Sequence, residues 1–436
     1  FLFIFIFIFI FIFKLSLFLM KSVGIIGAGA AGLCAGRACL RAGYSFVIFE
    51  QTDQIGGTWV FHEEPGVHSS MYEKLHTNLP KEIMEFPGFP FRKGPRSFVE
   101  HTVVLEYLQD YGREVEKFIR FNSKVLKVFR NFENGTWKVK IEFDKKIENF
   151  EFNFIFVCNG HFYKSRIPDF SENLSIPFIH SHDYRSPSDY CRKTVAVVGA
   201  GPSGVDIALQ LEKNASKIYI CHKSHSTTKL KFSKKIEIVP GAKSAKKNEL
   251  ILDDGKILKN LDTVIFCTGY KYFFNFFDSN IVKIKENESY VSSLFFHVAH
   301  VNYIDSLFFI GLNTSVLPFT LFDYQINFAF SLMQGRSKFI EKEKIDNWEQ
   351  DRLRYLSSKG IPFKYFHFLG DSQWSYYEEL ATLSGIPYSI PPVFQKIYKA
   401  VAEGRRTQIT NYKTVNYEIL SDTQFRQFDS GYRDYF

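Results

Sequence analysis

Two copies of one motif constrain this chain more than any other feature. In each copy an apolar strand runs into Gly-x-Gly-x-x-Gly, and a helix and a second strand follow. The copies read VGIIGAGAAGLCAGRACLRAGYSFVIFE and TVAVVGAGPSGVDIALQLEKNASKIYICHK. Such a unit places a glycine turn and a helix N-terminus at one edge of a parallel sheet, where they bind a dinucleotide pyrophosphate. The sequence therefore predicts an α/β protein with two dinucleotide-binding, Rossmann-like domains.

The three glycines of each motif have separate tasks. The first permits the tight turn, the second lets the pyrophosphate approach the backbone, and the third lets helix and strand pack closely. A bare motif of this kind is weak evidence, but here strand, helix and second strand are all in place. The predicted pyrophosphate-binding glycines are Gly27, Gly29 and Gly32 in the first motif and Gly199, Gly201 and Gly204 in the second.

The two motifs differ in charge where their second strands end. Glu50 ends the strand of the first motif, and His222 followed by Lys223 stands at the corresponding place in the second. A carboxylate accepts hydrogen bonds from ribose hydroxyls and repels a 2′-phosphate, whereas a cation pairs with that phosphate. The pattern predicts FAD at the first motif and NADPH at the second, although Lys223 could also be an ordinary solvated lysine.

The order of the motifs predicts the domain organisation. We expect an FAD-binding domain formed by 20–165 and 296–436, with an NADP-binding domain, 166–295, inserted into it. Two further apolar strands that end in glycine turns, FIFVCNGH and TVIFCTGY, are placed to complete the two sheets.

The N-terminus has a different character. Phe and Ile alternate over residues 3–13, as translation of a TTTATT repeat would produce, and no cleavage site of a signal peptide follows. Met20 lies just before the first motif. We interpret residues 1–19 as a spurious extension and Met20 as the start, with a membrane anchor as the alternative.

Composition excludes several classes of function. The net charge of +8 comes from scattered basic residues, which does not indicate nucleic-acid binding. The six cysteines form no C-x-x-C pair, so neither a metal site nor a disulfide framework is expected. No 18-residue apolar run follows Met20, so no transmembrane helix is expected there. These features favour a cytoplasmic protein, with peripheral membrane contact left open.

Several segments together resemble the flavin-containing monooxygenases. They are GAGAAG, IGGTW, SSMYEKLHTNLPKEIMEFPGFPF, GAGPSGVDIA and FCTGY, and the stretch containing TNLPKE is the most specific. The resemblance spans nearly all of residues 22–428. The C-terminal part, with HFLGDSQWSYYEELATLSG, is most similar to the insect branch that includes senecionine N-oxygenase.

The resemblance implies NADPH- and dioxygen-dependent addition of one oxygen atom to an amine nitrogen or a sulfur. In the family, a flavin hydroperoxide transfers the oxygen to xenobiotics or plant alkaloids, and the protein supplies orientation and a dry pocket. Asn78 is implied as the catalytic amide beside flavin and nicotinamide. The additional residues implied in FAD binding are Gly56, Gly57, Trp59 and Gln325. The alternatives are a simple loop at Gly56 and Gly57 and a helix-surface position for Gln325.

One family fingerprint, Phe-x-Gly-x-x-x-His-x-x-x-aromatic, is only half present. His180 and Tyr184 keep its second half, whereas no glycine lies between Phe170 and His180. His180 could therefore be a structural linker.

Two alternatives to a monooxygenase stay open at this point. One is an uncoupled NADPH oxidase on the same fold, which would release hydrogen peroxide. The other is a flavin-binding protein without catalysis, against which the intact glycines of both motifs argue.

Overall fold

The computed structural model describes residues 21–66, 68–223, 232–433 and 435. The interpretation of residues 1–19, with a start at Met20, lies outside these residues. Packing divides the chain into two compact units, each assembled from three segments. Unit 1 comprises the described residues of Phe1–Ile55, Leu108–Asn159 and Phe274–Pro387, and unit 2 comprises those of Gly56–Tyr107, Gly160–Phe273 and Tyr388–Phe436.

This division differs from the predicted segments. Residues 56–107 and 388–436 belong to unit 2, whereas the sequence predicts both within the FAD-binding domain. One boundary falls inside helix α3 (His101–Gly112). The sequence of a continuous helix does not indicate a boundary between two units. The assignment of cofactor-binding domains to residue ranges stays a prediction.

Unit 1 is built on a seven-stranded sheet in the order β20-β21-β22-β7-β1-β2-β3. The five strands from β22 to β3 pair in parallel, and the short β21 pairs antiparallel with both β22 and β20. β1 and β7 are buried along nearly their whole length, as expected for a parallel sheet covered on both faces. The strands are β20 (Leu294–Phe295), β21 (Ala299–His300), β22 (Leu307–Phe309), β7 (Phe154–Val157), β1 (Ser22–Ile26), β2 (Ser45–Phe49) and β3 (Ile119–Arg120).

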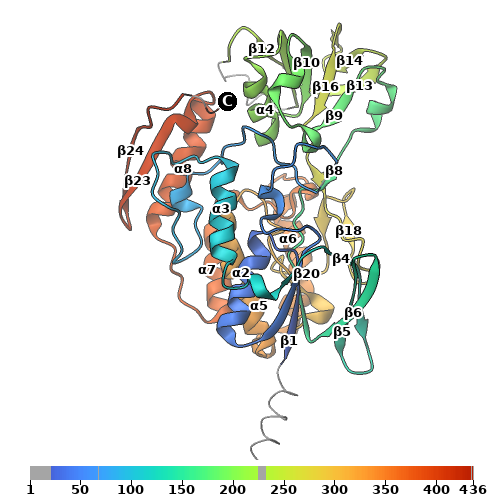
Figure 1. Cartoon of the computed structure of the whole chain (residues 1–436), viewed down its shortest axis with the longest axis vertical. Helices are drawn as coiled ribbons and strands as arrows, with labels where there is room; N and C mark the ends of the chain where they lie inside the picture. The colour runs from blue at the N-terminus through green and yellow to red at the C-terminus, as the bar shows by residue number, and fades with distance from the viewer. Residues whose placement is uncertain (1–20, 67, 224–231, 434, 436) are drawn as a thin grey trace, which may run out of the picture. The chain divides into compact units, whose positions relative to one another are not determined.

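Two layers cover this sheet (Figure 1). On one side, α2 (Ala30–Ala42) packs on β1 and β2, α5 (Pro318–Met333) packs on α2, and α7 (Gln373–Ser384) packs on α5. On the other side lies an antiparallel meander whose rings, such as Phe150, meet Phe49 of β2. The meander strands are β4 (Ser123–Asn131), β5 (Thr136–Phe143) and β6 (Lys146–Phe152). The unit also contains α6 (Lys342–Ser358), β18 (Ile284–Lys285) and β19 (Tyr290–Val291).

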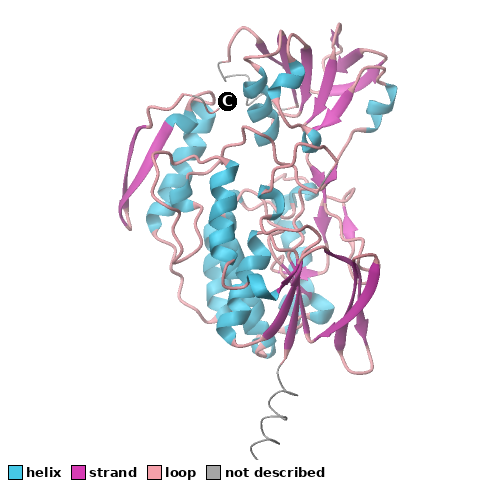
Figure 2. Ribbon diagram, in the orientation of Figure 1, coloured by secondary structure: helices cyan, strands magenta, loops and turns pink. Residues whose placement is uncertain are grey.

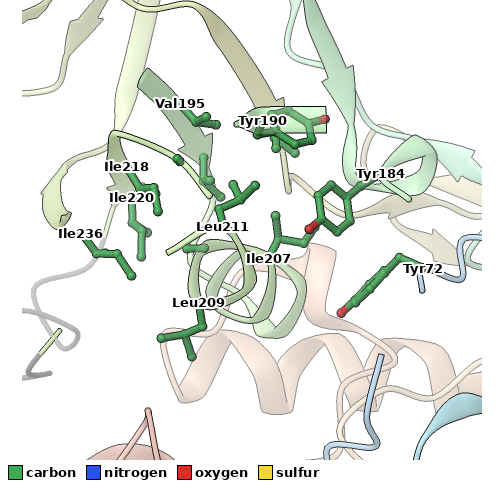
Figure 3. Packing of buried hydrophobic residues seen from close by; sticks show 14 residues of the cluster. Tyr72, Tyr184, Tyr190, Val195, Ile207, Leu209, Leu211, Ile218, Ile220 and Ile236 are labelled. Atoms are coloured by element: carbon green, nitrogen blue, oxygen red, sulfur yellow. The ribbon is translucent and has the colours of Figure 1, made fainter. Parts of the chain in front are cut away.

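Unit 2 is built on a five-stranded sheet that is parallel throughout, in the order β12-β11-β10-β16-β9. Alternate residues of β10 point to opposite faces, and both faces are buried. Val195 and Val197 face the core around α4 (Pro202–Leu211), shown in Figure 3, while Ala196 and Val198 face β13 and β14. The strands are β12 (Ile236–Pro240), β11 (Lys217–His222), β10 (Thr194–Val198), β16 (Thr263–Phe266), β9 (Phe178–His180), β13 (Ala242–Lys246), β14 (Glu249–Leu252) and β15 (Ile257–Leu258).

The end of the chain adds a helix and a hairpin to unit 2. Helix α8 (Pro392–Thr407) packs against the hairpin of β23 (Val415–Ser421) and β24 (Gln424–Asp429), as Figure 2 shows. A two-strand ribbon, β8 (Lys164–Ser165) with β17 (Tyr270–Lys271), lies elsewhere in the unit. Within the described part of the chain, no helix has the length and apolar character needed to cross a bilayer.

Candidate cofactor sites

The first glycine motif forms a turn between β1 and α2 in unit 1. Gly27 has φ +101°, a left-handed conformation that favours glycine, and its N–H donates to the carbonyl of Phe49 at 2.8 Å. A Cβ atom on Gly32 would collide with the carbonyl oxygen of Gly27. Only glycine at both places lets α2 start this close to the turn, so the N–H groups of its first turn face the space where a phosphate would bind.

Glu50 lies directly beside this turn. Its buried carboxylate accepts from the N–H of Ala28 at 2.8 Å, and from both the N–H and the hydroxyl of Thr52 at 2.9 Å. A carboxylate has about four acceptor positions, so these three bonds fix its orientation and leave capacity for a ribose hydroxyl. The residues present thus fit FAD, or another dinucleotide with a free ribose.

The second motif repeats this geometry in unit 2. Gly199 has φ +112°, and its N–H donates to the carbonyl of Cys221 at 3.0 Å. A Cβ atom on Gly204 would collide with the carbonyl oxygen of Gly199. Beside Gly201, by contrast, a Cβ atom would meet no heavy atom of the described residues within 4 Å. The turn therefore has the open space that a pyrophosphate needs.

His222 and Lys223 stand at the same edge of the unit 2 sheet as this turn. Val198, the last residue of β10, pairs with Cys221 of the parallel β11, so both strands end side by side. His222 ends β11, and Lys223 follows with an exposed side chain. A cation in this position can reach a ribose 2′-phosphate of a dinucleotide bound at Gly201.

The strands predicted to complete the two sheets do so. β7 pairs in parallel with β1, and β16 pairs in parallel with β10. Each then supports its glycine turn, because a Cβ atom on Gly27 would meet the carbonyl of Cys158, and one on Gly199 that of Cys267. The placement of both segments is confirmed.

Asn78 has an exposed side chain in unit 2. Its Oδ1 accepts from the hydroxyl of Tyr412 at 3.1 Å, which fixes the amide without using its two N–H donors. The residue before it is anchored by a bond from the Thr77 N–H to the carbonyl of Val99 at 2.9 Å. The predicted catalytic role of Asn78 stays a prediction.

Gly56, Gly57 and Trp59 form a short turn, η1 (Gly57–Trp59), in unit 2. Gly56 has φ +139° and Gly57 has φ +56°, and a Cβ atom on Gly56 would collide with Leu105. The fold itself therefore favours glycine here. The predicted contact of this turn with FAD stays a prediction.

Gln325 is fully buried in α5 of unit 1 and does not lie on the protein surface. Its Oε1 accepts from the N–H of Gly311 at 2.8 Å, and its Nε2 donates to Asn313 at 2.8 Å and to Tyr376 at 2.9 Å. The amide oxygen and one amide donor thus hold the turn that follows β22, and the other donor binds Tyr376 of α7. The predicted contact of Gln325 with the flavin ring stays a prediction.

His180, from the half-present fingerprint, joins two strand ends of unit 2. Its Nδ1 accepts from the N–H of His182 at 3.1 Å, so Nε2 carries the proton and donates to the carbonyl of Gly269 at 3.0 Å. Burial lowers the pKa of His180 to about 4, which keeps this neutral form at physiological pH. His180 thus links the end of β9 to the segment that follows β16, as a structural residue would.

Comparisons with known proteins agree with this architecture. A family model described as flavin-binding monooxygenase-like matches residues 20–233 and 230–394. Flavin-containing monooxygenase FMO GS-OX-like 2 of Arabidopsis thaliana is 32% identical over an alignment of 393 residues, with 83% of this chain and 84% of the relative covered. GS-OX-like 6 of the same plant is 34% identical over 390 residues, 81% of each chain.

Solved structures show the same fold. S-allyl-L-cysteine S-oxygenase from Allium sativum superimposes with a TM-score of 0.84 at 30% identity, over 90% of this chain and 94% of that one. Tmm from Pelagibacter sp. strain HTCC7211 superimposes with a TM-score of 0.81 at 25% identity, over 93% and 96%. These matches confirm the predicted fold class with two Rossmann-like domains, and the chain belongs to the flavin-binding monooxygenase-like family.

Proposed function

We propose that this protein uses NADPH and dioxygen to add one oxygen atom to a nucleophilic nitrogen or sulfur of a small molecule. The enzymes of its family use FAD and NADPH. The observation that carries the proposal is the repeated glycine turn with opposite charge beside it, Glu50 at the first and Lys223 at the second. One turn suits a dinucleotide with a free ribose, and the other suits a ribose that carries a 2′-phosphate.

The residues of the chain have distinct tasks in this proposal. The backbone at Gly29 and Gly201 admits the two pyrophosphates, and Glu50 orients a ribose of FAD. Lys223 pairs with the 2′-phosphate of NADPH, and the amide of Asn78 holds its nicotinamide end. When bound, FAD supplies the redox chemistry that activates dioxygen, which side chains alone lack.

Sulfur or nitrogen as the accepting atom rests on the relatives. The Allium sativum enzyme at 30% identity is an S-oxygenase by name. The N-oxygenation of alkaloids that the insect resemblance implies is the second candidate within the same chemistry. Both atoms carry a lone pair that can accept an oxygen, so one cofactor arrangement serves either.

The NADPH balance tests this function against an uncoupled oxidase. Purified protein is supplied with NADPH, dioxygen and either methyl phenyl sulfide or N,N-dimethylaniline, and NADPH consumption, hydrogen peroxide and oxidised product are measured together. A monooxygenase lowers peroxide and forms sulfoxide or N-oxide when a substrate is present. Peroxide equal to NADPH under all conditions would identify an oxidase, and no NADPH consumption would identify a flavin-binding protein without catalysis.

Lys223→Ala should weaken binding of NADPH roughly 10- to 150-fold and leave NADH binding nearly unchanged. The lost charge-assisted contact to the 2′-phosphate is worth about 1.5–3 kcal/mol. The measurement is the concentration dependence of flavin reduction by each nucleotide. Lys217→Ala is the matched control, because Lys217 begins the same strand and pairs with Glu237 at 2.8 Å. Equal weakening of NADPH and NADH by Lys223→Ala would exclude recognition of the phosphate.

Asn78→Leu should leave NADPH oxidation in place, raise hydrogen peroxide release and lower product formation. Leucine has a similar size but neither donates nor accepts, so the amide contacts are lost at about 1–3 kcal/mol, which is roughly 5- to 150-fold in the step that uses them. The measured quantity is product formed per NADPH consumed. An unchanged ratio would reduce Asn78 to a residue that only bonds Tyr412.

A further inference from the structure

A buried polar cluster in unit 2 has no assigned part in the predicted binding of either cofactor. It centres on Lys413 in η12 (Tyr412–Thr414), whose side chain is 0% exposed. The Lys413 ammonium donates to Asp206 at 2.8 Å and to the backbone carbonyl of His76 at 3.1 Å. The other oxygen of Asp206 accepts from the hydroxyl of Tyr72. We refer to Lys413, Asp206 and Tyr72 as the Lys413 cluster.

The Lys413 cluster joins three segments that are far apart in the sequence. Asp206 lies in the second turn of α4, the helix that begins at Pro202 directly after Gly201. Tyr72 packs in the core beside α4, near Ile207 and Tyr184, as Figure 3 shows. The nucleotide-binding turn is therefore connected through α4 both to the segment that precedes Asn78 and to η12.

Two hydrogen bonds join η12 to the segment that contains Asn78. Lys413 holds the carbonyl of His76, two residues before Asn78, and the hydroxyl of Tyr412 donates to the Asn78 Oδ1 at 3.1 Å. Tyr412 has little freedom, because it is buried and its ring packs edge-on against Phe98 at 5.5 Å between centroids. The orientation of the Asn78 amide relative to α4 is thus set by side chains from the last part of the chain.

Stability alone does not account for this arrangement. A buried ion pair loses the hydration of both charges, and apolar side chains of similar volume often stabilise a fold equally well. Burial is the largest single influence and favours the neutral amine, but the charge and hydrogen bond of Asp206 together with Tyr412 raise the pKa of Lys413 overall, so the ammonium persists at neutral pH. Unlike apolar packing, hydrogen bonds from that ammonium have fixed directions.

We propose that Tyr412 and Lys413 are positioning residues that hold the Asn78 amide in register with the nucleotide bound at α4. The proposal rests on the function proposed for Asn78. Tyr412 fixes the amide directly, and Lys413 fixes the backbone that leads to it. Loss of either contact lets the amide move and lowers the fraction of NADPH that is used for oxygenation.

Tyr412→Phe tests this with the loss of one oxygen atom. The ring stays in the core, and hydrogen peroxide released per NADPH should rise roughly 2- to 10-fold with methyl phenyl sulfide as substrate, as expected for one hydrogen bond. This ratio counts only turnovers of folded enzyme, so a merely structural role would not change it. Tyr417→Phe is the matched control, because its hydroxyl lies in the same segment but interacts with Gln427.

A double variant separates positioning from other effects. If Tyr412 acts through Asn78, then Tyr412→Phe combined with Asn78→Leu should release no more peroxide per NADPH than Asn78→Leu alone. An unchanged ratio in Tyr412→Phe, with a raised ratio in Asn78→Leu, would overturn the positioning role and leave the role of Asn78 intact. An unchanged ratio in Asn78→Leu would overturn both.

The ion pair is tested by replacing both partners. Lys413→Met alone leaves Asp206 buried without its cation, which endangers folding. Lys413→Met combined with Asp206→Asn keeps the volume, removes both charges and leaves an acceptor for Tyr72 and Gln210, so folded protein is expected. A raised peroxide ratio in this folded double variant supports the proposal, whereas a ratio equal to that of the unmodified protein overturns the part assigned to Lys413.

Discussion

Gly29→Val yields colourless protein, if the first glycine turn binds FAD. Gly29 has φ −75° and ψ −176°, an extended conformation that valine adopts without strain. The substitution therefore leaves the backbone intact and places two methyl groups where the pyrophosphate approaches. The loss of two charge-assisted contacts weakens FAD binding by about 3–6 kcal/mol, or at least roughly 100-fold. The flavin absorbance of purified protein, relative to protein concentration, measures the effect.

Gly201→Val should have the second large effect, and it is also the control for Gly29→Val. Gly201 has nearly the same backbone angles, φ −70° and ψ −177°, and its Cβ would enter open space. The variant should fold and stay yellow, but its reduction by NADPH should be slower by roughly 100-fold or more at a fixed nucleotide concentration, for the same physical reason. Flavin bleaching under anaerobic conditions measures this rate.

The pair of variants also tests which cofactor each unit binds. A yellow Gly29→Val protein that NADPH no longer reduces, together with a colourless Gly201→Val protein, would reverse the two sites. Loss of flavin from both variants would indicate a general defect in folding, which circular dichroism of each protein would reveal.

The sequence predicts the two glycine turns because their geometry depends on residues close together in the chain. Gly32 meets Gly27 within one strand–helix turn, and Glu50 reaches Ala28 from the neighbouring parallel strand. Such contacts follow from the regular β-α-β unit, so the residue pattern is sufficient.

The Lys413 cluster has no comparable sequence signal. Asp206 and Lys413 are separated by 207 positions, and nothing in the sequence marks them as a pair. Only the packing of α4 against the end of the chain makes them a buried pair. Gln325 shows the same limit, because the sequence does not reveal that α7 provides Tyr376 as its buried partner.

The sequence does not predict the division into units for a related reason. The TNLPKE stretch marks the family, and its residues resemble neither a domain boundary nor a linker. Two contacts tie the segments on either side of this stretch to the end of the chain: the Ser97 N–H donates to Asn416 at 2.8 Å, and Lys413 donates to the carbonyl of His76. These are long-range hydrogen bonds, which have no periodicity in the sequence.

Oxygen isotope labelling tests the central claim most directly. The protein is supplied with NADPH, methyl phenyl sulfide or N,N-dimethylaniline, and dioxygen labelled with oxygen-18, and the product is analysed by mass spectrometry. We expect a sulfoxide or N-oxide that carries one labelled oxygen atom, formed only when NADPH is present. Complete consumption of NADPH with all labelled oxygen in hydrogen peroxide and none in either product would contradict it.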